Sequence, residues 1–172
     1  MTETIQYDEL PVIRLREITS DDRALLSELG TAEVEGEWNT FDDAPESMLS
    51  GAYYGGGSLL IELLDETPVG VVTWIQIPYG PNRRSLAWNI GITVHPVFRG
   101  RHIGAAAQRL LAQELFSTSD ANRVVADTDI ANVAEQRSLE RAGFSREGVA
   151  RGAQWRRGAW HDRVIYSRLR TD

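Results

Sequence analysis

A short basic segment, Arg99-Gly100-Arg101-His102-Ile103-Gly104, is the part of the sequence best suited to chemistry. It follows Ser85–Val94, which alternates and becomes β-branched like a buried strand. Apolar residues at helical spacing begin at its end and continue beyond it: Ile103, Ala107, Leu110, Leu111 and Leu115. The first N–H groups of such a helix would lie beside two guanidinium groups, and the positive end of the helix favours an anion. The segment therefore predicts an anion site, with phosphate as the expected anion.

The same segment also fits an ordinary surface turn that carries two arginines. It is not a P-loop, because no Gly-Lys-Ser/Thr follows, and it is not a GxGxxG dinucleotide turn. His95-Pro96 ends the strand before it, since proline cannot donate a hydrogen bond to a sheet. The local sequence alone leaves both interpretations open.

The composition restricts the class of protein. The 172 residues have an ordinary content of apolar and charged side chains and are expected to form one domain, residues 1–172. The chain has no cysteine and only three histidines, without the spacing of a metal motif, so we expect no metal. A net charge of −7 argues against nucleic-acid binding and favours a cationic partner such as an amine. No segment resembles a membrane span or a signal peptide, so we expect no membrane and a cytoplasmic location.

The patterns along the chain predict a mixture of strands and helices. Strands are expected over residues 12–16, 58–64, 68–77, 85–94, 123–128, 144–155 and 159–169. Helices are expected over residues 24–29, 46–54 and 132–142, the last closed by Gly143 in a left-handed cap with Phe144 packed back, and from residue 103 to an end near residues 117–121. A helix that connects strands 85–94 and 123–128 requires these two to be parallel neighbours or nearly so. The fold class is therefore α+β, with a mixed, mostly antiparallel central sheet of about seven strands flanked by about four helices. A ligand is expected at the carboxyl end of strand 85–94.

Five segments in this order carry a resemblance to a known family. They are RLREITSDD, ETPVGVVTW, RGRHIGAAA, DIANVAEQRSLERAGF and GAWHDRVIYSRL, and they run over nearly the whole chain. Together they resemble the GNAT (GCN5-related N-acetyltransferase) family, and more narrowly its RimJ/RimL-type branch, which acetylates protein N-termini and many other amines. The resemblance implies the GNAT fold and an acyltransferase that moves an acetyl group from acetyl-CoA to a primary amine by direct attack.

The family's pyrophosphate motif, Arg/Gln-x-x-Gly-x-Gly/Ala, maps onto residues 99–104. The resemblance implies that backbone N–H groups from about Arg101 to Ala105 bind the pyrophosphate and that the strand before them pairs with pantetheine. One N–H group of that strand would hold the oxyanion of the tetrahedral intermediate. The residues implied in coenzyme A binding are Ile92, Thr93, Val94, Arg99, Gly100, Arg101, His102, Ile103, Gly104, Ala105, Asn132 and Arg137. His102 departs from the motif's first glycine, and binding is expected to survive if its backbone keeps normal helical angles.

Asn132 and Ser138 are the candidate catalytic residues. Asn132 matches the family's asparagine near the pantetheine and the thiol, and it also fits an N-cap that forms a capping box with Glu135. Ser138 is a candidate acid for the departing thiolate, and it also fits a small packing residue. Arg141 lies one turn beyond Arg137 and is expected on a solvated helix face.

Three positions depart from the family where protons are handled. Leu139 stands where many members have a tyrosine acid. Glu135 stands where the ribosomal-protein branch has a serine, and Gln154 where that branch has a glutamate base. We therefore expect neither that branch's mechanism nor its substrate to be copied. Other residues could relay a proton through a water molecule: Asp127, Glu62 and His161. Each of them also fits a structural role.

The acceptor is left open between a protein N-terminus and a small-molecule amine. An α-amine with a pKa of about 8 is partly neutral near pH 7, so it needs less help to lose its proton than a lysine side chain with a pKa of about 10. Residues 30–54 and the loop 78–84 are expected to flank the strand end, where an acceptor pocket would be lined by Trp38, Tyr53, Tyr54 and Tyr79. The alternatives are another donor, succinyl-CoA or an aminoacyl carrier that meets Arg83-Arg84, a CoA-binding module without catalysis, and a general interaction domain. The oligomeric state is left open between a monomer and a homodimer.

Overall fold

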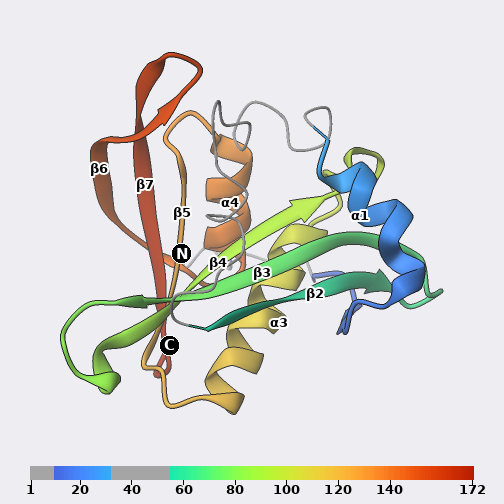
Figure 1. Cartoon of the computed structure of the whole chain (residues 1–172), viewed down its shortest axis with the longest axis horizontal. Helices are drawn as coiled ribbons and strands as arrows, with labels where there is room; N and C mark the ends of the chain where they lie inside the picture. Colours follow the sequence, from blue (N-terminus) through green and yellow to red (C-terminus); the bar gives the residue numbers. More distant parts are fainter. Residues whose placement is uncertain (1–9, 32–54) are drawn as a thin grey trace, which may run out of the picture.

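The computed structural model describes residues 10–31 and 55–172, and their strands form one seven-stranded sheet of order β1-β2-β3-β4-β5-β7-β6 (Figure 1). Every neighbouring pair is antiparallel except β4 and β5, which are parallel. The strands are β1 (Ile13–Arg16), β2 (Gly56–Leu63), β3 (Pro68–Pro78), β4 (Leu86–Val94), β5 (Arg123–Asp129), β6 (Ser145–Arg156) and β7 (Ala159–Leu169). The predicted α+β class, the mixed sheet and the parallel pair are confirmed.

The described residues contain the helices α1 (Arg23–Leu29), α3 (Ile103–Thr118) and α4 (Val133–Arg141). The predicted helix over residues 46–54 lies outside the described residues. Helix α3 connects β4 to β5, contacts β1, β3 and β4, and packs against α4, which in turn contacts β5 and β6. Figure 1 shows α3 crossing behind β2 and β3. Because α3 and α4 touch, side chains from both helices can share one site.

The apolar core explains why these segments form these elements. The helical spacing of Ile103, Ala107, Leu111 and Leu115 gives α3 a buried face. Strand β5 is buried over most of its length, as expected for a strand near the middle of a sheet. The C-terminus of α4 has the predicted form: Gly143 has a φ of 90°, and the Phe144 N–H donates to the Leu139 carbonyl at 3.0 Å.

Strands β4 and β5 part near their middle. They are paired only at Trp88 with Val124 and at Asn89 with Val125. Along its other edge β4 stays paired with β3 as far as Val94. The second half of β4 therefore has one edge facing a gap within the sheet, and this gap lies at the carboxyl end of β4, close to the start of α3.

In the part of the chain that the structure describes, no helix is both long and apolar enough to cross a membrane. Residues 10–31 and 55–172 also contain no group of three or more His, Asp or Glu side chains placed to hold a metal ion.

Candidate active site

The gap between β4 and β5 is the mouth of a cleft with a volume of about 1160 Å³. Its walls come from the second half of β4, the turn before α3, the first turn of α3, the end of β5 and one side of α4, with further residues from the middle of β3 and from β7. All predicted site residues except Arg101 line it: Ile92, Thr93, Val94, Arg99, Gly100, His102, Ile103, Gly104, Ala105, Asn132, Arg137 and Ser138. The structure thus brings together residues that lie far apart in the sequence.

The turn before α3 has the backbone of an anion site. Gly100 has a φ of 75° and His102 has a φ of 59°, so both adopt left-handed conformations. The first helical residues, Ile103 to Ala105, follow directly, and N–H groups in the first turn of a helix lack partners within the helix. These N–H groups and the positive end of a 16-residue helix meet at the cleft.

The normal helical angles at His102 on which the expected survival of binding depended are not found. The left-handed region favours the glycine that the family motif has at this position, and a side chain there has a steric cost of about 1–2 kcal/mol. The imidazole has a partner: the Arg141 Nη1 atom lies 2.7 Å from His102 Nδ1. The predicted solvated position of Arg141 is also wrong, because its side chain lines the cleft and holds His102.

The two arginines of the turn differ in position. The Arg99 Nε atom donates to the Val94 carbonyl at 2.9 Å, and its side chain lines the cleft. The Arg101 guanidinium lies over the Phe98 ring, 5.5 Å from its centroid. Arg101 is outside the cleft wall, so of the two only Arg99 faces the cleft.

Asn132 fits both of its predicted roles. Its side-chain oxygen accepts from the Glu135 N–H at 3.3 Å as an N-cap of α4, and its amide nitrogen donates to Thr128 Oγ1 at 3.1 Å. The side chain lines the cleft at the same time. The second half of the predicted capping box does not form, because the Asn132 N–H donates to the Asp129 carbonyl and Glu135 turns toward α3.

Ser138 and Glu135 are joined by a residue that the sequence analysis missed. The Gln108 side chain is almost fully buried, accepts from Ser138 Oγ at 3.0 Å and donates to Glu135 Oε1. A Cβ atom at Gly104 would lie 3.1 Å from Ser138 Oγ, so the glycine keeps the cleft open at this point. Burial raises the pKa of Glu135 to about 7, while the hydrogen bond from Gln108 opposes the shift. A polar residue one turn after Gly104, on a helix face of small and apolar residues, was the available signal for Gln108.

Of the remaining residues considered for proton transfer, some line the cleft and others lie away from it. Leu139 is fully buried in the core. Glu62 lies on β2 outside the cleft wall and accepts from Arg16 Nε at 2.6 Å, so its position does not fit a relay. Asp127 lines the cleft and pairs with Arg163, whose Nη1 atom also donates to Gln154 at 2.9 Å.

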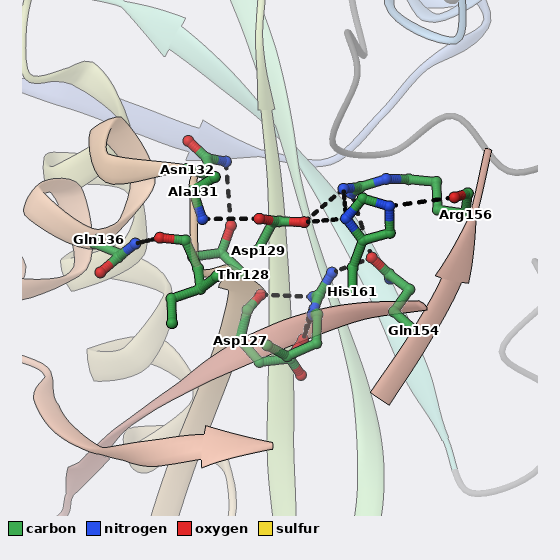
Figure 2. Close-up of polar contacts among 11 residues, drawn as sticks. Asp127, Thr128, Asp129, Ala131, Asn132, Gln136, Gln154, Arg156 and His161 are labelled. Carbon is green, nitrogen blue, oxygen red and sulfur yellow. Dashed lines mark hydrogen bonds and ion pairs between the residues drawn. The ribbon is translucent and has the colours of Figure 1, made fainter. Parts of the chain in front are cut away.

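A buried ion pair supports the turn that leads into α4, as Figure 2 shows. Asp129 Oδ2 lies 2.5 Å from Arg156 Nη2, and both side chains are almost fully buried. The other Asp129 oxygen accepts from the Ala131 N–H at 2.8 Å, and His161 Nδ1 lies 3.1 Å from the carboxylate. Burial opposes ionisation of Asp129, but the Ala131 N–H and the Arg156 guanidinium together keep its pKa below the usual value. The sequence suggested His161 as a relay, whereas the structure holds it in this cluster.

The predicted acceptor pocket is only partly described. Trp38, Tyr53 and Tyr54 lie outside the described residues. Tyr79 does not line the cleft, and its ring packs under the Arg123 guanidinium at 5.1 Å. The expectation that loop 78–84 flanks the cleft is wrong, because β3 and β4 are antiparallel and their connecting loop lies at the opposite end of β4.

Comparisons with known proteins agree with this geometry. The model of the acetyltransferase (GNAT) domain family matches residues 13–145. The probable N-acetyltransferase YjcK of Bacillus subtilis is 27% identical over 139 residues, which cover 81% of this chain and 74% of that protein. Among solved structures, RimJ of Mycobacterium smegmatis in complex with CoA-disulfide superposes with a TM-score of 0.77 at 22% identity, covering 94% of this chain and 83% of that one.

A second structural neighbour is the spermidine N-acetyltransferase of Vibrio cholerae in complex with CoA and spermine. It has a TM-score of 0.75 at 15% identity and covers 92% of this chain and 96% of that one. Both structures show that the fold is shared. The family match extends over most of the sheet and both helices that form the cleft. This chain therefore belongs to the GNAT acetyltransferase family and is a CoA-dependent N-acetyltransferase.

Proposed function

We propose that the protein transfers an acetyl group from acetyl-CoA to a primary amine, either a protein N-terminus or a small-molecule amine, by direct attack in the cleft between β4 and β5. The observation that carries this proposal is the parting of β4 from β5 after Asn89, beside a helix N-terminus that carries a basic turn. This arrangement offers an open strand edge to an extended chain and N–H groups to its phosphates.

The donor site follows from the cleft wall. The N–H groups of Ile103 to Ala105 would hold the pyrophosphate, with Arg99 and Arg137 nearby. The free edge of β4 at residues 92–94 would pair with pantetheine, and one of its N–H groups would hold the oxyanion. The structural neighbours that were captured with CoA-disulfide, or with CoA and spermine, support a CoA thioester as donor and an amine as acceptor.

The acceptor is proposed as an amine from the reaction class and the charge of the chain. A net charge of −7 attracts cations over long range. Asp127 provides a carboxylate on the cleft wall, although Arg163 partly neutralises it. An α-amine is favoured over a lysine because a larger fraction of it is neutral near pH 7.

Calorimetric titration with acetyl-CoA, CoA and succinyl-CoA tests the donor site. We expect micromolar binding that is lost in Gly104→Trp, because the new ring would fill the space in front of Ser138. Gly148→Trp is the matched control: it is in β6, where a Cβ meets nothing within 4 Å, and binding should persist. No binding of any of the three ligands by the wild type would overturn the proposal. Binding without transfer to spermine or to an alanine-starting peptide would favour a CoA-binding module.

A further inference from the structure

Glu135 lies in an unusual environment for a carboxyl group in an acyltransfer cleft. Its side chain lines the cleft within a turn of Asn132 and Ser138, and its hydrogen-bond donor is the neutral amide of Gln108. Among the described residues, no arginine forms an ion pair with it, although Arg137 and Arg141 are on the same helix. A half-buried carboxyl group that has no ion-pair partner among the described residues is able to carry a proton near neutral pH.

A purely structural role does not account for this position. A glutamate at the third position of a helix commonly returns to the N-cap N–H in a capping box. Here the Asn132 N–H donates to the Asp129 carbonyl, so Glu135 is not needed as a cap. Gln108 instead fixes it beside Ser138: its oxygen accepts from Ser138 and its nitrogen donates to Glu135, so one buried amide orients both cleft groups.

We propose that Glu135 is the catalytic acid that protonates the departing thiolate of coenzyme A, and that Gln108 is the positioning residue that aims it. This inference rests on the proposed function. The amine nitrogen forms a bond to the acetyl carbon, and the C–S bond then breaks. The sulfur takes the proton of the Glu135 carboxyl group, leaving a carboxylate. The proton that the new amide nitrogen loses passes to water, and water returns a proton to Glu135, so the net change is N–H to S–H.

The expected pH dependence of kcat follows from the need for Glu135 in its protonated form. Burial raises the pKa of Glu135 to about 7, so its reactive protonated form is lost as pH rises through neutrality. The charged or titratable groups that line the same cleft from the turn, the helices and the strands are Arg99, His102, Asp127, Arg137, Arg141 and Arg163. Any change of kcat with pH that these other groups cause would remain when Glu135 is replaced.

Glu135→Gln, compared with Glu140→Gln, tests the assignment. Glu140 is on the same helix outside the cleft wall, and its variant keeps an oxygen for the Tyr166 hydroxyl. With spermine or an alanine-starting peptide as acceptor, we expect Glu135→Gln to lower kcat about 100-fold. It should lose the descending limb near pH 7, while the dissociation constant of CoA changes by less than about twofold. Glu140→Gln should match the wild type in all three measurements.

A second measurement needs no acceptor. The pH dependence of alkylation of bound CoA by iodoacetamide reports the pKa of its thiol. A carboxylate beside the sulfur disfavours the thiolate, so Glu135→Gln should lower that pKa by about half a unit or more. An unchanged thiol pKa, or a kcat and pH profile like those of Glu140→Gln, would overturn the role of Glu135 while leaving the transferase intact. Absence of CoA binding by the wild type would instead overturn the proposed function and this inference with it.

Discussion

The pKa of Glu135 also affects folding. In the unfolded chain this carboxyl group titrates near 4.5, and in the folded protein near 7. Between these values the folded state binds more protons than the unfolded state, so the free energy of unfolding falls as pH rises. The catalytic acid proposed for the cleft is therefore a source of instability above pH 7.

Replacing that carboxyl group should stabilise the protein at alkaline pH. We expect Glu135→Gln to be more stable than the wild type at pH 8 by about 1–3 kcal/mol, with the difference vanishing toward pH 4. Urea unfolding at several pH values measures this. Glu140→Gln should show no such pH-dependent gain, and an equal gain in both variants would contradict the cause assigned here.

Helix α3 starts at a residue that is unusual for its backbone. His102 adopts a φ of 59°, and its imidazole contacts Arg141 on α4. The histidine thus combines a strained helix start with a link between the two helices that form the cleft. The sequence predicted the extent of α3 well but not this conformation, because the left-handed angle depends on the path of the turn rather than on the residue type.

The strain predicts an order of stability between two small substitutions. His102→Gly should be more stable than His102→Ala by about 1 kcal/mol, because both remove the imidazole and only glycine accepts the left-handed angle without cost. At Gln113, an exposed position inside α3, the order should reverse, since alanine favours helices. Thermal unfolding of the four variants compares them, and a more stable alanine at position 102 would contradict the assigned conformation.

Across the whole molecule, one buried ion pair connects distant parts of the chain. Arg156, near the end of β6, reaches Asp129 at the end of β5, just before the turn into α4 (Figure 2). The β6–β7 hairpin thereby supports the turn that presents Asn132. This pair has no counterpart in any local sequence pattern, because its partners are separated by 27 positions.

Removing one member should destabilise the fold strongly. Arg156→Ala leaves the Asp129 carboxylate buried without its guanidinium, and we expect a loss of about 3–5 kcal/mol in urea unfolding at pH 7. Arg151→Ala, an exposed arginine on the same strand, should change stability by less than about 0.5 kcal/mol. A loss below about 1 kcal/mol for Arg156→Ala would show that the pair contributes little.

The arrangement of strands and helices could be predicted largely from local patterns. The strands predicted over residues 58–64 and 68–77 match β2 and β3 closely, and proline, glycine and the change of period marked both ends of the turn before α3. The residues of the site were harder to predict from the sequence than the strands and helices. Gln108 stands out as a polar residue on an apolar helix face, but its partners Ser138 and Glu135 lie 30 and 27 positions further along the chain, so no local pattern assigns them. Glu135 was expected to cap its own helix. Loop 78–84 was placed at the wrong end of β4: it directly precedes the strand and so lies at its amino end, which the order of the chain already implied.

The parting of β4 and β5 has a consequence for solubility. An unpaired strand edge normally invites strands of other chains, and proteins protect such edges with charges, prolines or a covering segment. Here an unpaired edge lies inside the sheet, between β3 on one side and β5 across the gap. A second polypeptide would have to enter between two strands that are hydrogen-bonded to each other at Trp88 and Asn89. This edge therefore has a strand on both sides and is less open to other chains than an outer edge of the sheet would be.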